Sequence, residues 1–194
     1  MINNFSYRQL LLAGILFETI IFLIFFYSKQ ELADVFRYSA RYSGRLSLII
    51  YLYCFYKFYR AFLIKDNLKR VKDLVFIFGV LHVIHFGFLV LSVYLNDLPI
   101  IPVKITGGAL AYLMIIIYPF IIEKIKKHIY HLVYFYYVGI VMLMTYVARI
   151  NGDFVGAEPE IFHKIAFIFL ILVFLKFGYT FYKQRKNFKK WIEL

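Results

Sequence analysis

The histidines are the residues of this chain whose type and spacing could do chemistry. His82 and His85 lie in one apolar run, and His128 and His131 repeat the same spacing at the start of another. A spacing of three places both side chains of a pair on one face of a helix. Ionisable residues within apolar helices are costly and usually mark a functional site. The fifth histidine, His163, stands at the edge of a further apolar run, where we expect a solvated side chain.

Two neutral imidazoles on facing helices are suited to axial ligation of haem b, which needs an apolar slot and no covalent attachment. We predict His82 and His131 as the two ligands of the haem iron, because this pairing has the smallest mismatch in depth along the helices. His85 is the competing ligand on the same helix, or a core histidine that bonds a neighbouring helix. His128 follows two lysines and is typical of an interfacial side chain. Structural zinc is less attractive, because it needs four ligands and no cysteine or carboxylate joins these histidines at a suitable spacing.

The elements that must position these histidines are long apolar segments. The chain is 63% apolar and only 18% charged, with a mean hydropathy of +0.74. These figures exclude a disordered chain and a disulfide-stapled secreted domain. About 20 apolar residues are enough to cross a bilayer as a helix. We therefore predict an all-α integral membrane protein, a six-helix bundle that forms one transmembrane domain over residues 1–194. The six predicted spans are approximately 9–27, 44–62, 73–95, 103–122, 128–148 and 162–182.

The basic residues predict how this bundle is oriented. The net charge is +12, and lysine and arginine fall in short clusters between the apolar runs. About twice as many of them lie on the side that holds both termini, which the positive-inside rule places in the cytoplasm. The charge is therefore interpreted as a topology signal, and no nucleic-acid partner is expected. The first apolar run is longer than a typical signal core, so we expect a retained helix.

Three further residues stand inside predicted spans. Glu18 should face the bundle, carry a proton or find a partner, because a bare carboxylate in lipid is costly. It could serve proton transfer or quinol deprotonation, or it could make a structural hydrogen bond to a neighbouring helix. Pro119 is expected to kink or end the fourth span. Cys54, the single cysteine, is interpreted as a small packing residue.

Two stretches suggest an internal duplication. Residues 43–48 (SGRLSL) open the second span and residues 106–111 (TGGALA) open the fourth, each with a hydroxyl, a glycine and small residues. Small residues let helices approach closely in lipid. Each stretch is followed by a basic loop and then by a helix that carries histidines. Each glycine by itself is equally consistent with ordinary packing, whereas the two together favour a repeated hairpin.

With the basic pair at 69–70 before Leu81–His82, and with His131–Leu132, these stretches resemble the ferric-reductase-like transmembrane domain family. The likeness covers residues 41–149 and is closest to the haem-binding membrane subunit of the bacterial methionine-sulfoxide reductase system. The resemblance implies a multi-pass haem b protein of the bacterial inner membrane. Such a subunit passes electrons from a quinol or a cytosolic flavin carrier to a partner reductase or another acceptor. His82 and His131 fall on the ligand positions of the family.

The chain departs from the family at Met144, where a further histidine is common in the fifth span. We therefore expect one haem, with Met144 either as an additional ligand or as a packing residue. There is no glycine-rich nucleotide motif, so no flavin or nicotinamide site is expected in this chain and the electron donor is a separate flavoprotein or a quinol. The alternative is a haem-free membrane protein: a degenerate family member, a small transporter that relies on Glu18, or an assembly factor.

Overall fold

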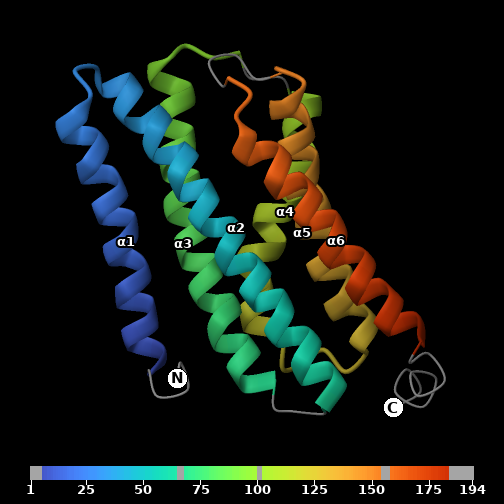
Figure 1. Cartoon of the computed structure of the whole chain (residues 1–194). Coiled ribbons are helices and arrows are strands. Elements are labelled where there is room, and N and C mark those ends of the chain that lie inside the picture. The colour runs from blue at the N-terminus through green and yellow to red at the C-terminus, as the bar shows by residue number, and fades with distance from the viewer. Residues whose placement is uncertain (1–5, 65–67, 100–101, 154–157, 184–194) are drawn as a thin grey trace. The chain divides into compact units, whose positions relative to one another are not determined.

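The computed structural model describes residues 6–64, 68–99, 102–153 and 158–183, and over these residues the chain is all-helical (Figure 1). This confirms the predicted all-α class. Six helices follow one another along the chain, joined by short connections. They are α1 (Tyr7–Ser28), α2 (Leu32–Ile64), α3 (Leu68–Leu95), α4 (Pro102–Ile121), α5 (His128–Ile150) and α6 (Ile161–Lys183).

Within the part of the chain that the structure describes, four helices are long and apolar enough to cross a membrane: α1, α3, α5 and α6. The chain is therefore a multi-pass membrane protein whose surroundings are a lipid bilayer. This agrees with the apolar composition, because a helix satisfies all of its own backbone hydrogen bonds in lipid.

The largest difference from the predicted elements is the start of α2, which begins at Leu32 and not near residue 44. Its first turns carry Asp34, Arg37 and Arg41, so a hydropathy pattern alone leaves them out of the span. At 1.5 Å per residue, the 33 residues of α2 extend over about 50 Å. The helix is therefore longer than a hydrocarbon core of about 30 Å requires.

The helices divide into two compact units. The first unit contains α1, α2 and α3 together with residues 102–105 and 115–119 of α4. The second contains residues 106–114 and 120–121 of α4 together with α5 and α6.

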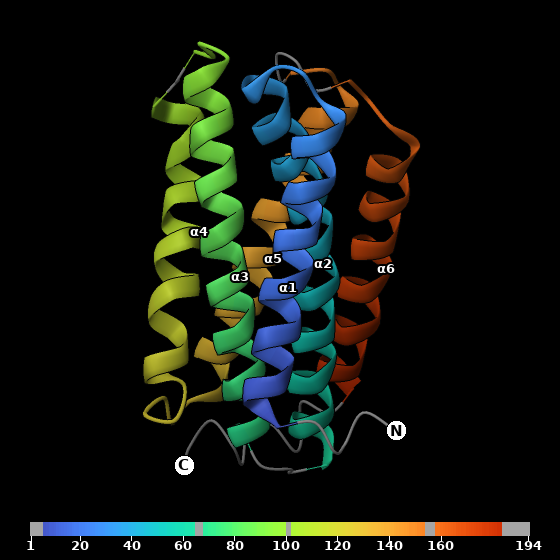
Figure 2. The same cartoon turned by 90° about the vertical axis from the view of Figure 1, so that its left-hand side faces the viewer.

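In the first unit, α2 and α3 pack along one another and α1 packs against both (Figures 1 and 2). Large aromatic side chains that are fully buried fill this core, among them Tyr51, Phe55 and Phe78. Close approach is possible at Gly79 of α3, where an added Cβ would lie 3.3 Å from the carbonyl oxygen of Ile115. A small residue at this position lets the two backbones meet.

In the second unit, tyrosine hydroxyls join the helices. Tyr136 of α5 donates to the carbonyl oxygen of Phe174 in α6 at 3.3 Å, and Tyr137 donates to the carbonyl oxygen of Gly107 in α4 at 3.2 Å. In lipid, such interhelical hydrogen bonds contribute alongside packing to helix association. Pro119 belongs to the part of α4 in the first unit. It lies inside the last turn of α4, which ends two residues later at Ile121.

Candidate functional site

The two histidines of α3 lie on one face of the helix, as their spacing predicts. The ring of His82 lies 5.3 Å from the ring of His85 and 5.1 Å from the ring of Phe78, measured between centroids. His82 is 8% exposed. Close packing of the rings of Phe78 and His85 restrains the orientation of the buried His82 imidazole.

His85 packs against α2 at Gly44. A Cβ added at Gly44 would lie 3.1 Å from Cε1 of the His85 ring, closer than ordinary van der Waals contact. The glycine that opens the first of the two similar stretches therefore makes room for an imidazole. The sequence indicated a small packing residue at Gly44, and the structure identifies His85 as the group that it accommodates.

His131 of α5 is fully buried in the second unit. Its Nε2 atom lies 3.3 Å from the carbonyl oxygen of Ile125, in the connection before the helix. The ring of His128 lies 6.0 Å away, which again places both members of a pair on one helix face. A backbone carbonyl on one ring nitrogen restrains the orientation of the ring.

Two other predicted residues lie elsewhere. His163 is 2% exposed, so the expectation of a solvated side chain is wrong. Its Nδ1 accepts a hydrogen bond from the backbone N–H of Glu160 at 3.1 Å, and its ring packs near Tyr146, so it supports the start of α6. Met144, the other suggested haem ligand, is 59% exposed on α5.

The chemistry of the candidate ligands indicates which kind of metal group they could hold. Among the described residues, no three histidine, cysteine, aspartate or glutamate side chains gather into a group that could hold a metal ion. A bare ion such as zinc needs that many protein ligands. A haem brings four nitrogen ligands of its own and needs only one or two from the protein. A helix that offers only one or two buried imidazoles, as at His82 and at His131, therefore fits a haem better than a bare ion.

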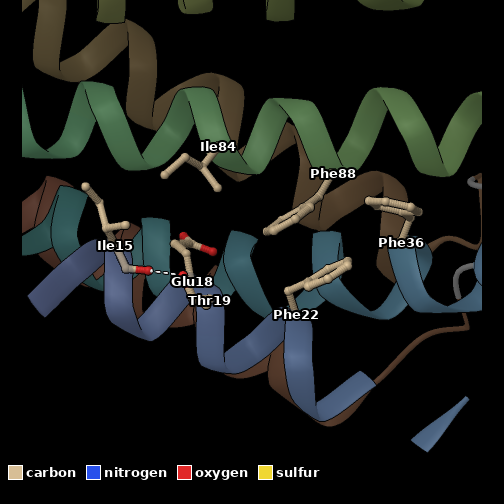
Figure 3. A pocket seen from close by; sticks show the side chains of 7 residues that line it. All are labelled: Ile15, Glu18, Thr19, Phe22, Phe36, Ile84 and Phe88. Carbon is tan, nitrogen blue, oxygen red and sulfur yellow. Dashed lines mark hydrogen bonds between the residues drawn. The ribbon is translucent and has the colours of Figure 1, made fainter. Parts of the chain in front are cut away.

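Glu18 forms a second candidate site, in the first unit. It is 2% exposed near the middle of α1, and neither carboxyl oxygen has a hydrogen-bond partner among the described residues. Ser43 of α2 is the hydroxyl that lies against it. The carboxyl group lies at an open groove of about 290 Å³ (Figure 3). The groove is lined by Ile15, Glu18, Thr19, Phe22, Phe36, Ile84 and Phe88.

The groove is almost entirely apolar apart from this carboxyl. Thr19 turns its hydroxyl back to the carbonyl oxygen of Ile15 at 2.9 Å, as Figure 3 shows. The rings of Phe22 and Phe88 are stacked, with centroids 5.9 Å apart and an interplanar angle of 4°. Glu18 is therefore the polar group that the groove presents.

A row of serines on α2 accompanies Glu18. Ser39, Ser43 and Ser47 follow one another at a spacing of four and are at most 1% exposed. None of the three hydroxyls has a hydrogen-bond partner among the described residues. This row was missed from the sequence, although the spacing of four between the serines is a helical period and is the signal by which it could have been found.

No protein-family model, curated protein or solved structure matches the chain. The likeness to ferric-reductase-like domains therefore stays a prediction from the short stretches quoted above. Both candidate sites rest on the geometry of their own residues.

Proposed function

We propose that the chain is a membrane haem b electron-transfer subunit in which His82 and His131 would hold one haem. It crosses the bacterial inner membrane six times with both termini in the cytoplasm, and resembles ferric-reductase-like domains in this plan. It passes electrons from a quinol or a cytosolic flavin carrier to a separate reductase or another acceptor. The basic C-terminal tail, a candidate docking segment for an acidic partner, lies outside the described residues.

One observation carries this proposal: two different apolar helices each bury one imidazole among hydrophobic neighbours. His82 and His131 are 8% and 0% exposed. A neutral imidazole is the form that ligates haem iron, and a bound haem would supply reversible one-electron chemistry.

The chain's own residues would orient these ligands. The rings of Phe78 and His85 lie on either side of His82 in sequence and contact its ring, which restrains its rotation. In His131, the carbonyl oxygen of Ile125 lies 3.3 Å from Nε2, and this contact restrains the ring. Both restraints would keep an imidazole in position while an iron changes its oxidation state.

A reduced-minus-oxidised visible spectrum of the purified protein tests the proposal. We expect a b-type spectrum from protein made in haem-supplied cells, and its loss in His82→Ala and in His131→Ala. His128→Ala is the matched control, because it removes a half-buried histidine from the same face of α5 and should keep the colour. If His85→Ala abolishes the spectrum and His82→Ala does not, the ligand on α3 is His85. An intact but colourless wild-type protein would contradict the haem proposal.

The alternative, a haem-free membrane protein such as a small transporter, is favoured by one observation. Glu18 is buried in α1 with both oxygens lacking a hydrogen-bond partner among the described residues. A transporter would need this carboxyl and no cofactor. Loss of function in Glu18→Gln together with a colourless wild-type protein would support this alternative.

A further inference from the structure

The carboxyl group of Glu18 is buried at a place where an ionised carboxylate is costly. It lies near the middle of the 22 residues of α1, about as far from water as that helix permits. Ser43 is the polar group beside it, and no hydrogen bond of good geometry from the described residues reaches either oxygen. An unpaired charge in a low-dielectric interior is strongly unfavourable, so it must be neutralised.

A metal ion does not fit as the neutralising group. Ser39, Ser43 and Ser47 stand one helical turn apart, about 6 Å along the axis of α2. Oxygen ligands of a cation lie within about 2.6 Å of the ion, so these three hydroxyls cannot share one. A proton on the carboxyl removes the charge without any further ligand.

Glu18 is the titratable side chain among the residues that line the groove. The residues that line the groove from α2 and α3 are Phe36, Ile84 and Phe88, none of which titrates. On α3, the titratable side chain His85 packs against α2 at Gly44, the residue that follows Ser43. No ion pair to Glu18 is present among the described residues.

We propose that Glu18 is a proton-binding site within the membrane, a carboxylic acid that holds a proton beside Ser43 and exchanges it along the hydroxyls of Ser39 and Ser47. Two hydrogen bonds through one water span about 5.6 Å, which matches the axial separation of successive serines. The groove lined by Phe22 and Phe88 gives lipid-soluble reagents access to the acid. This site is independent of haem binding.

Infrared spectroscopy of the full chain in lipid tests the protonation. We expect the carbonyl band of a protonated carboxylic acid at neutral pH, lost in Glu18→Gln and kept in Glu31→Gln, an exposed carboxylate after α1. In D₂O the band should shift, and Ser43→Ala and Ser47→Ala should slow that shift several-fold. Absence of the band, or a band that does not shift in D₂O, overturns the proposal.

Chemical labelling tests access through the groove. Dicyclohexylcarbodiimide is lipid-soluble and reacts with protonated carboxyl groups, whereas a water-soluble carbodiimide should modify Glu31. We expect the lipid-soluble reagent to modify Glu18, and Ile84→Trp, which fills the groove, to slow the reaction several-fold. Ile84→Val is the matched control, because it enlarges the groove and should leave the rate unchanged or higher. Failure of the reagent to modify Glu18 in folded wild-type protein overturns the proposal.

Discussion

Asn96 joins the end of α3 to the start of α2 through its side-chain amide. Its Nδ2 donates to the carbonyl oxygens of Ala33 at 3.1 Å and Ser92 at 2.8 Å, and its Oδ1 accepts from the guanidinium of Arg37. Arg37 also pairs with Asp34 at 3.1 Å. One amide therefore forms hydrogen bonds with groups on two helices. These bonds attach the polar start of α2 to the end of α3.

Replacement of this amide should be costly. We expect Asn96→Ala to lower the free energy of unfolding by about 1.5–3 kcal/mol, because it removes two donated hydrogen bonds and one from a charged group. Unfolding in mixed micelles measures the change. Asn96→Asp keeps the acceptor for Arg37 but turns an oxygen toward both carbonyl oxygens, so it should be destabilised as well. An Asn96→Ala variant as stable as wild type would show that water replaces the amide.

At the scale of the elements, glycines mark where helices of the first unit meet. Gly79 of α3 faces the carbonyl oxygen of Ile115, and no atom lies within 4 Å of a Cβ added at Gly87 of the same helix. The two positions therefore differ in packing although both are glycines in one apolar span. Backbone approach at Gly79 depends on the absence of a side chain.

This contrast gives a paired test in one helix. We expect Gly79→Val to lower stability by about 1–3 kcal/mol, because its methyl groups push α3 away from residues 115–119. Gly87→Val adds the same side chain in open space and should change stability by less than about 0.5 kcal/mol. Thermal unfolding in detergent measures both. Equal losses in the two variants would mean that helix propensity, and not close packing, decides the effect.

At the scale of the whole molecule, basic clusters predict which connections face the cytoplasm. The connection after α4 carries Lys124, Lys126 and Lys127, whereas the one after α5 begins with Asn151, Gly152 and Asp153. The positive-inside rule predicts that the first connection faces the cytoplasm and the second faces the outside.

The native cysteine makes this orientation easy to test, because Cys54 is fully buried and should not react with a thiol reagent in the folded protein. We expect a membrane-impermeant maleimide to label Asp153→Cys in intact cells and Lys126→Cys only after permeabilisation. Both positions are exposed, so lack of reaction reports sidedness and not burial. The reverse pattern would place both termini outside and contradict the proposed topology.

The helices of this chain could be predicted from its sequence, because a run of apolar residues in lipid has to be helical to satisfy its own backbone. The shared face of His82 and His85 followed from the helical period for the same local reason. The start of α2 at Leu32 could not be predicted from hydropathy, because charged residues lower the apolar signal without breaking the helix.

Contacts between helices were decided by the tertiary structure. The rotation of each helix about its own axis sets which side chains meet, and a change of one residue turns the contact face by about 100°. Apolar composition does not fix that rotation. Glu18 against Ser43, His85 against Gly44 and the apolar groove all depend on it, and so does the burial of His163. By itself, the sequence determined that the chain is helical and belongs in a membrane, and the packing of its helices decided which polar groups lie together inside.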